Sequence, residues 1–593
     1  MKREGNRDAA GTGLRPAPAG IVPFFSYLPE DPEEAQAIFQ SLQIKDQLEF
    51  VLSCRGKERL RALFLSEHPE ELVQSLPELE IFLTVKDLGE KDALDLISTS
   101  TAEQFQYLLD LELWKKDELD PKKILHWMEI LLECGEKKVT QFIRASDLEW
   151  IALLLKKFLH VTTLEGEPLE VRDRIPLFTL DQHYFILFRK PETRVVFQPF
   201  LEIFYRVDAN GYRRVMEAQI VELESELEEE GYRLRNARMA DYGFPNFEEA
   251  LEIYRFINPD TPLLKEGFLA TTAQGEAGRG GSTFYLTFQE EGPFLASILS
   301  KVDDPSEVDR LKEEITLLCN KAIVADSVDR FTLEEMGRVA EKVFHTLNLG
   351  LQYLSREEEE RALEILRSHP IQKIFQCGVG ATLLLKKKAE SILKGRWFGG
   401  DRENLVFLDP PHLERFAGIL KKRPGLYRNG RVEDFKSLRD LEEMKVFLES
   451  LEVIVRTLGE TLAVSPLELR GLDLTGCHPG DWRELTLSTV FLTSIANQVL
   501  FKVFRFGAID QSRLKELLSH ILDRNEQGKG VVRMEIEEGI RNWIDSVQED
   551  RGRREHLLAF WDFCRDLFEE QYGRIPSGEE VDPRFVKGLL IRK

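Results

Sequence analysis

The chain has 593 residues, of which 42% are hydrophobic and 10% aromatic, and its formal net charge is −24. This length exceeds what one hydrophobic core supports, so we expect several domains, and the composition excludes a disordered or collagen-like chain. The negative charge opposes binding of nucleic acid or of an anionic membrane by the whole surface, although a local basic patch can still bind either. The six cysteines form no Cys-x-x-Cys pair, which is typical of reduced thiols in a cytoplasmic protein.

The first segment, residues 1–20, is polar and rich in Gly, Ala and Pro. It contains no apolar stretch of the kind that a signal peptide needs, and we expect a disordered tail. A helical array is expected over residues 21–165. Pro69, Pro77 and Pro121 each occupy a position suited to the first residue of a helix, where a missing N–H is harmless. Short helices that follow one another closely are typical of an α-solenoid, whose repeats bury their apolar faces on their neighbours.

Other features of the array concern its caps and its core. Ser100 and Glu103 have the spacing of a capping box. Trp114, Trp127 and Trp150 fall on expected helices, and we expect their rings to be buried between helix layers. Because solenoids mostly present surfaces, the array predicts a docking surface for another protein.

Residues 166–270 are expected to form a central α+β segment. Aromatic and β-branched residues over 176–206, with a break at 190–193, predict a β-hairpin whose second run turns helical after Pro199. A long helix is expected from residue 212 to residue 240 because apolar residues recur there at helical spacing. A capped helix begins after it and ends ahead of the next proline.

A loop of small residues, 271–282, predicts a linker between domains. Its Gly275–Ser282 run resembles a phosphate-binding loop, but Gly281 stands where that motif has its lysine. A strand rather than the required helix is expected next, at 283–288, so the linker is favoured over a phosphate loop.

Helical periodicity returns in the remainder of the chain. We expect a helical domain over 283–395 and a C-terminal helical domain over 396–593. The longest apolar-leaning run, 485–504, contains Asn497 and Lys502 among several polar residues. It therefore predicts a buried core helix rather than a membrane span, which needs about 20 mainly apolar residues.

Three short patterns resemble chemical sites. Glu341 with His345, and Glu516 with His520, place a carboxylate and an imidazole four residues apart on expected helices, but no third ligand recurs nearby. Residues 477–478 are an adjacent Cys and His in a turn, whereas catalytic Cys–His pairs usually come from distant segments. Each pattern also has an ordinary structural explanation. The sequence therefore indicates no catalytic residue, no metal ligand and no cofactor.

Charge is unevenly distributed along the chain. Residues 217–230 contain seven glutamates and neither Lys nor Arg, whereas residues 386–431 contain twelve Lys and Arg against five Asp and Glu, a net of +7. We call the second segment the basic island. With its interleaved aromatic residues it can hold phosphates and stack bases. Alternatively, it contacts the protein's own acidic surface or is a solvated face. The candidate anion- or partner-binding residues are Lys386, Lys387, Lys388, Trp397, Lys421, Lys422 and Arg423, with Arg235 and Arg238 after the acidic run.

Three strings carry a resemblance to a known family: DALDLISTSTAEQFQYLLDLELW (92–114), ESELEEEGYRLRNARMADYGFPNFEEALEIY (224–254) and HTLNLGLQYL (345–354). Together they resemble a bacterial family of domains of unknown function, family 6178, over most of the chain. The resemblance implies a long, soluble, mainly helical protein and lends no catalytic residues. Residues 70–160 are also similar in style to the cytosolic N-terminal helical domain of bacterial magnesium transporters and to flagellar rotor switch domains.

These observations predict a mainly α, multi-domain, cytoplasmic protein. It has an α-solenoid-like array at the N-terminus, a small β-hairpin element in the middle and a helical C-terminal half. The expected function is a protein-protein interaction or regulatory module whose array docks another protein, with no membrane partner. Two alternatives are open: an enzyme with its site in residues 166–270, and a nucleic-acid-associated protein that uses residues 386–431.

Overall fold

The computed structural model describes residues 32–115, 117–163, 177–261, 283–326, 331–525, 528–575 and 581–593. The expected tail, the expected linker and its phosphate-loop-like motif lie outside these described residues. The described residues are mostly helical with a few short strand pairs, so the expected mainly α fold class is confirmed. The chain forms two compact units. Unit 1 consists of Met1–Arg255 and Pro262–Gly378, and unit 2 of Phe256–Thr261 and Val379–Lys593. The finer division into domains stays a prediction.

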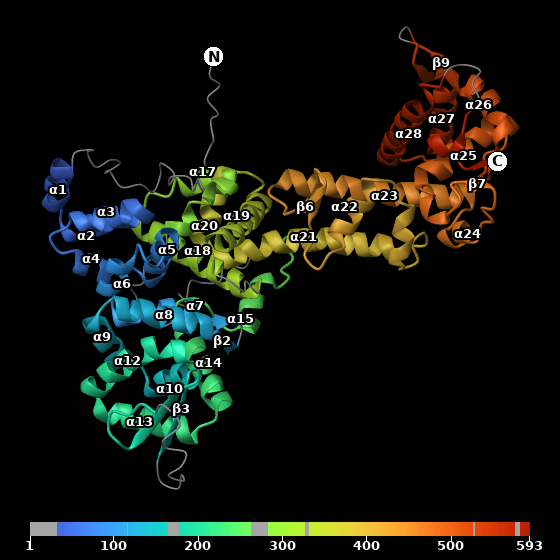
Figure 1. The fold of residues 1–593 in the computed structure, drawn as a ribbon. Coiled ribbons are helices and arrows are strands. Elements are labelled where there is room, and N and C mark those ends of the chain that lie inside the picture. The colour runs from blue at the N-terminus through green and yellow to red at the C-terminus, as the bar shows by residue number, and fades with distance from the viewer. Residues whose placement is uncertain are drawn as a thin grey trace, which may run out of the picture. The chain divides into compact units, whose positions relative to one another are not determined.

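The N-terminal part of unit 1 is an array of short helices, coloured blue to cyan in Figure 1. The helices are α1 (Pro32–Ser41), α2 (Ile44–Ser53), α3 (Gly56–Leu65), α4 (Pro69–Ser75), α5 (Glu78–Leu88), α6 (Leu94–Thr99), α7 (Ala102–Glu112), α8 (Pro121–Glu133), α9 (Glu136–Ala145) and α10 (Leu148–Lys156). A strand pair of two residues each, β1 (Trp114–Lys115) and β2 (Glu118–Leu119), interrupts the array between α7 and α8. The helical character of this segment is as predicted, whereas an internal repeat stays a prediction.

Local signals in the sequence set most of the helix starts. Pro69 and Pro121 are the first residues of α4 and α8, while Pro77 directly precedes α5. The capping box lies one residue later than the predicted one. The Thr101 hydroxyl accepts from Gln104 N at 3.0 Å, and Gln104 Oε1 accepts from Thr101 N at 2.8 Å. A glutamine amide also donates, and Gln104 Nε2 bonds the Leu76 carbonyl at 2.8 Å, so the cap also ties α7 to the chain after α4.

The three tryptophans of the array are buried, as predicted. Trp114, Trp127 and Trp150 are 5%, 2% and 2% exposed. Trp127 meets Phe105 edge-on with ring centroids 6.2 Å apart, and Trp114 stacks on Trp150 at 6.1 Å. Aromatic pairs in these geometries stabilise a core beyond the area that they bury.

A buried arginine holds three of the first helices together. Arg59 in α3 forms an ion pair with Glu80 in α5, with Nη1 2.7 Å from Oε2, and both side chains are 2% exposed. Arg59 Nε also donates to the Val51 carbonyl at 3.0 Å in α2. A buried charge is tolerated only when it is paired and its remaining donors are hydrogen-bonded, and this pair meets that condition.

The central segment differs from the predicted hairpin. The first apolar run does form a strand, β4 (Tyr184–Phe188), but its antiparallel partner is β3 (Leu159–Thr163), which precedes it in the chain. The second run is helical from its start as α12 (Arg194–Val207), preceded by the 3-10 helix η1 (Pro191–Thr193). Its buried residues recur at intervals of three and four, which suits a helix rather than a strand: Val196, Phe197, Phe200, Leu201 and Phe204.

The long helix predicted over residues 212–240 is two helices, α13 (Ala209–Val221) and α14 (Glu224–Asp241). The predicted apolar stripe fails at the break, because Leu223 between the helices is exposed. In Figure 1, α13 lies beside α10 and β3, in agreement with the packing of these elements. A helix α15 (Phe247–Leu251), capped by the Asn246 side chain on Glu249 N at 2.9 Å, and η2 (Glu252–Tyr254) follow.

The rest of unit 1 consists of α16 (Thr283–Leu286), η3 (Gln289–Glu291), α17 (Pro293–Leu299), α18 (Pro305–Ala325), α19 (Leu333–Ser355), α20 (Glu359–Ser368) and the first part of α21 (Ile371–Lys394). The strand predicted at 283–288 is wrong. Phe284, Tyr285 and Leu286 are all buried in succession, whereas a half-buried strand alternates. The glycine of the third resemblance string allows a close helix contact, because a Cβ on Gly350 in α19 would lie 2.1 Å from the Ile374 carbonyl oxygen in α21.

Unit 2 contains the rest of α21 and then η4 (Arg402–Phe407), α22 (His412–Ile419), β5 (Leu426–Arg428), β6 (Arg431–Glu433), α23 (Leu438–Leu462), α24 (Pro466–Arg470), β7 (Cys477–His478), η5 (Trp482–Glu484), α25 (Leu487–Phe501), β8 (Ile509–Asp510), η6 (Gln511–Arg513), α26 (Leu514–Ile521), β9 (Leu522–Arg524), β10 (Gly530–Val532), α27 (Met534–Val547), α28 (Arg551–Tyr572), η7 (Pro583–Phe585) and β11 (Ile591–Arg592). The strand β11 lies between β7, antiparallel, and β8, parallel.

The apolar-leaning run 485–504 forms the buried helix α25, as predicted. Its polar side chains hold other segments in place. Thr493 Oγ1 accepts from Leu590 N at 3.0 Å, and Asn497 Nδ2 donates to the Gly507 carbonyl at 2.8 Å. Among the described residues, no helix is both long and apolar enough to cross a bilayer.

One lysine is buried in the array without a carboxylate partner among the described residues. Lys138 in α9 is 2% exposed. Its Nζ donates to the Ser100 carbonyl and hydroxyl at 2.5 and 2.9 Å, at the C-terminal end of α6. Carbonyls at a helix C-terminus attract a cation, but burial still lowers the pKa of Lys138 from 10.5 to about 8.

We expect Trp127→Ala to lower the free energy of unfolding by about 3–5 kcal/mol, because the cavity left by a buried indole is only partly closed. Denaturant unfolding followed by circular dichroism measures this change. Phe247→Ala is the control, because Phe247 is half exposed in the same unit. Equal losses in the two variants would contradict the buried position of Trp127.

Lys138 is expected to contribute an increase in stability between pH 8 and pH 9. Over this interval the unfolded chain keeps the lysine proton and the folded chain releases it, so unfolding takes up a proton and becomes less favourable by about 1 kcal/mol. The thiols of Cys54 and Cys134, whose pKa burial raises from 9.0 to about 11, contribute with the opposite sign from about pH 8 upward, because the unfolded chain releases their protons first. In denaturant titrations, Lys138→Met should lower the slope of the unfolding free energy against pH between pH 8 and pH 9. If the variant has the same slope as the wild type, Lys138 does not contribute to it.

Candidate functional site

The basic island divides into two groups by what its cations contact. In the first group each cation is paired with a carboxylate, mostly one from α23. The pairs are Lys388 with Glu449 at 3.1 Å, Arg415 with Glu443 at 2.7 Å, Arg428 with Asp440 at 3.0 Å, and Arg431 with Glu433. These four pairs neutralise part of the island's charge inside unit 2.

The second group gathers at the turn that follows α22. Lys386 Nζ, from α21, donates to the Lys422 carbonyl at 3.4 Å, and Arg402 Nη2, from η4, donates to the Leu420 carbonyl at 3.5 Å. The carbonyls at the end of a helix carry partial negative charge, which attracts both cations. The predicted lysine groups at 386–388 and at 421–423 are thus brought together although they are distant in the sequence.

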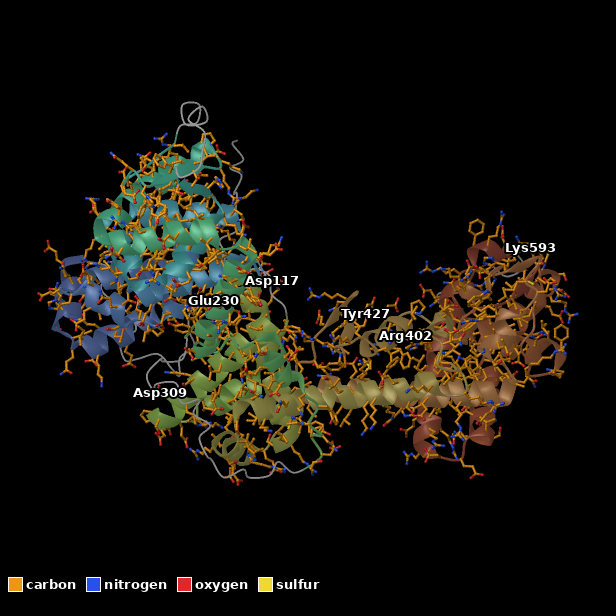
Figure 2. All side chains as sticks on the ribbon, turned by 90° about the horizontal axis from the view of Figure 1, so that it is seen from below. Asp117, Glu230, Asp309, Arg402, Tyr427 and Lys593 are labelled. Carbon is orange, nitrogen blue, oxygen red and sulfur yellow. The ribbon has the colours of Figure 1, made fainter. Side chains whose placement is uncertain are left out.

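The aromatic residues of the island behave differently from one another. Trp397 is 6% exposed and packs on α23, where a Cβ on Gly459 would lie 3.2 Å from its ring. Its ring is therefore part of the core of unit 2. Tyr427 is half-buried on β5, opposite Val432 of β6. Figure 2 labels Tyr427 and Arg402, which lie in the same part of unit 2.

The two arginines that follow the acidic run hold α14 against α7. Arg238 forms a two-pronged contact with the buried Asp110 carboxylate, with Nε 2.8 Å from Oδ2 and Nη2 2.9 Å from Oδ1. Arg235 Nε donates to the Asp110 carbonyl at 2.7 Å, and its guanidinium lies 5.8 Å from the Trp114 ring. Burial acts to lower the pKa of Arg238, but the hydrogen bonds and charge of Asp110 outweigh it and raise that pKa. These contacts give both arginines a structural role in unit 1.

The acidic run also contacts its own unit. Lys157 Nζ lies 2.8 Å from Glu224 and 3.1 Å from Glu228, and Glu228 Oε1 also accepts from Leu119 N at 2.9 Å. Arg233 pairs with Glu230, three residues before it on α14, by two hydrogen bonds. Several of these glutamates therefore anchor α14 to its neighbours.

The predicted carboxylate–imidazole patterns are not brought together as metal sites in the described residues. His345 Nε2 lies 2.9 Å from Glu291 Oε2, a residue of another segment. Glu516 pairs with Arg513 at 2.8 Å. No group of three or more His, Cys, Asp or Glu side chains placed to hold a metal ion occurs in the described part of the chain. All six cysteines are free thiols.

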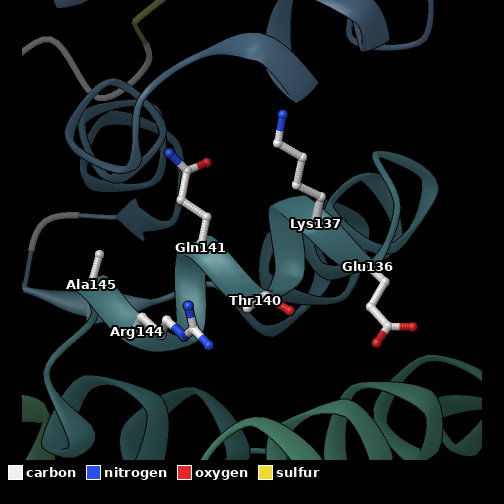
Figure 3. Close-up of a pocket in the computed structure, with 6 residues that line it drawn as sticks. All are labelled: Glu136, Lys137, Thr140, Gln141, Arg144 and Ala145. Atoms are coloured by element: carbon white, nitrogen blue, oxygen red, sulfur yellow. The ribbon is translucent and has the colours of Figure 1, made fainter.

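An open hollow of about 640 Å³ runs along α9. It is lined by Glu136, Lys137, Thr140, Gln141, Arg144 and Ala145. Figure 3 shows Lys137 and Gln141 pointing to one side of the helix, and Glu136 and Thr140 to the other. The lining contains one carboxylate and no His or Cys, so it offers neither an acid–base pair nor a nucleophile with its base.

A group of exposed apolar side chains lies at the N-terminal end of the array. Ile38 in α1 and Ile44 in α2 are each 41% exposed, and Phe64 in α3 is 52% exposed. The helices contact one another, since Gln40 Nε2 in α1 donates to the Leu65 carbonyl in α3 at 3.2 Å and Arg59 joins α3 to α2. We call these three side chains the α1–α3 apolar group. The sequence did not reveal it, because Phe64 also fits the apolar pattern of a buried helix face.

The chain belongs to the family described as "Family of unknown function (DUF6178)", whose model matches residues 36–592. This match agrees with the resemblance carried by the three sequence strings. No curated protein and no solved structure matches the chain. The similarity of residues 70–160 to magnesium transporters therefore stays an expectation.

Asp110→Asn is expected to lower the free energy of unfolding by about 2–3 kcal/mol, because it leaves the partly buried Arg238 without its charged partner. Arg238→Lys should lose part of this amount, since an ammonium cannot reproduce the two-pronged contact. Denaturant unfolding measures both changes, with the exposed Asp117→Asn as the control. If Asp110→Asn has the same unfolding midpoint as the wild type, Asp110 does not have this structural role.

Proposed function

We propose that this member of the DUF6178 family is a cytoplasmic protein-interaction module, and that the α1–α3 end of its helical array docks another protein. The observation that carries the proposal is the α1–α3 apolar group. Single exposed apolar residues are normal on soluble proteins, but a group of them on contacting helices is typical of an interaction site.

The surroundings of the α1–α3 apolar group indicate the kind of partner. The same three helices carry exposed side chains of both signs, among them Glu34 on α1, Lys45 on α2 and Arg61 on α3. An apolar centre with a polar rim is the usual composition of a protein-protein interface. The partner expected is a protein segment that presents apolar anchors, such as one face of an amphipathic helix.

Recognition is better supported than catalysis. The hollow along α9 has no acid–base pair, and several polar contacts in the described part of residues 166–270 serve packing. Tyr184 OH, for example, donates to Glu217 at 3.2 Å, and the Asp208 carboxylate caps α13. A helical array whose polar groups are used in this way suits a docking surface.

The test compares the double variant Ile44→Glu/Phe64→Glu with the wild-type chain. Each immobilised protein is exposed to a lysate of the source organism, and the retained proteins are quantified by mass spectrometry. We expect at least one protein to be retained by the wild type and lost by the variant, because a charge at the centre of an apolar interface is costly to desolvate.

The control is Val195→Glu/Val221→Glu, which adds the same charge at two apolar side chains of unit 1 that are 77% and 79% exposed. This control should retain the partner. Circular dichroism of both variants establishes that they are folded. Identical retention by wild type and test variant, or equal loss in the control, would contradict docking at the α1–α3 end.

A further inference from the structure

We propose that unit 2 binds single-stranded nucleic acid at the turn that follows α22. The binding residues are Lys386, Arg402, Lys421 and Lys422, which we call the basic cluster. This proposal is independent of the α1–α3 apolar group, which lies in unit 1.

Convergence of like charges is the first argument. Lys386 from α21 donates to the Lys422 carbonyl and Arg402 from η4 donates to the Leu420 carbonyl. Both cations therefore reach the turn on which Lys421 and Lys422 themselves lie. Cations held together repel one another, and an anion bound among them relieves that repulsion.

The second argument is the contrast with the rest of the basic island. Lys388, Arg415 and Arg428 each have a carboxylate partner on α23 within 3.1 Å. Within the described part of the chain, Lys421 and Lys422 have none. The carboxylate nearest to Lys386 is Glu390, at 4.0 Å from its Nζ. Four of the island's cations are thus paired with carboxylates at short distance, whereas this cluster is left open to an external anion.

The third argument concerns the type of anion. β5 packs on α22 through Gly425 N, which donates to the Gly418 carbonyl at 3.1 Å, and this places Tyr427 on the element that leaves the turn. The partly exposed Tyr427 follows the turn lysines on β5, and proteins that bind single strands combine such a ring, on which bases stack, with cations that hold the phosphates. A duplex or an anionic membrane requires a wider basic face, which the net charge of −24 opposes.

The number of open cations sets the expected salt dependence. About three to four cations that each neutralise one phosphate of a single strand give a slope of about −2 to −3 in a plot of log K against log salt. Binding is therefore expected to be weak at physiological salt and measurable at about 50 mM salt.

The experiment measures fluorescence anisotropy of a labelled oligo(dT) of about 12 nucleotides with the full-length chain. The triple variant Lys386→Glu/Lys421→Glu/Lys422→Glu should lose binding. The control Lys515→Glu/Lys529→Glu/Lys587→Glu makes the same charge change at exposed lysines elsewhere in unit 2 and should keep it, because distant surface charges are screened. Equal binding by wild type and triple variant would overturn the proposal.

Further arms separate a nucleic-acid site from a general anion site. Tyr427→Ala should weaken binding to the oligonucleotide by about 5- to 100-fold, and Tyr427→Phe should restore it, because the ring supplies the stacking. The affinity for inorganic polyphosphate, which has no bases to stack, should be the same in both variants as in the wild type. If Tyr427→Ala leaves oligonucleotide affinity unchanged, or if phosphatidylserine vesicles bind more tightly than the strand, the assignment to single-stranded nucleic acid is wrong.

Discussion

The buried carboxylate of Asp110 positions the helix on which the centre of unit 1 depends. Arg238 donates to both carboxylate oxygens of Asp110, and Arg235 donates to its backbone carbonyl, so α14 is fixed to α7. The rest of α14 can then reach other elements. Glu228 bonds Leu119 N, and Gly231 allows close packing, since a Cβ there would lie 2.5 Å from Leu153 in α10. One carboxylate thus determines where an acidic helix, otherwise with little apolar surface, can pack.

The parts of the fold that the sequence predicted are those that local chemistry decides. Pro69 and Pro121 begin helices because the N–H of the first helical residue has no acceptor within the helix, so its absence in proline costs nothing there. The partner of β4 could not be predicted, because strand pairing is a contact between separate segments and the run after Pro191 has both strand-like composition and helical spacing. At 283–288 the aromatic composition indicated a strand, but burial of successive residues favours the helix that forms.

The candidate site was predictable as a concentration of charge but not as a surface. Counting charges identified the basic island, yet it could not show that Arg415 is matched by Glu443 on α23 or that Arg235 is held by Asp110. The candidate binding residues also omitted Arg402, which lies between the two lysine groups in the sequence and reaches the turn through the Leu420 carbonyl. Net charge is a property of composition, whereas the charge available to a ligand is what remains after internal pairing.

The same reasoning links the two proposed surfaces. Buried polar groups such as Arg59 and Asn497 contact partners within their own unit, and several acidic residues of α14 contact Lys157 or Arg233. Against this background, the α1–α3 apolar group and the basic cluster are features that their own units do not cover or neutralise in the described part of the chain. The α1–α3 apolar group lacks an apolar partner, and the basic cluster lacks an anion. The two proposals therefore assign a different kind of partner to each compact unit, a protein to unit 1 and an anion to unit 2.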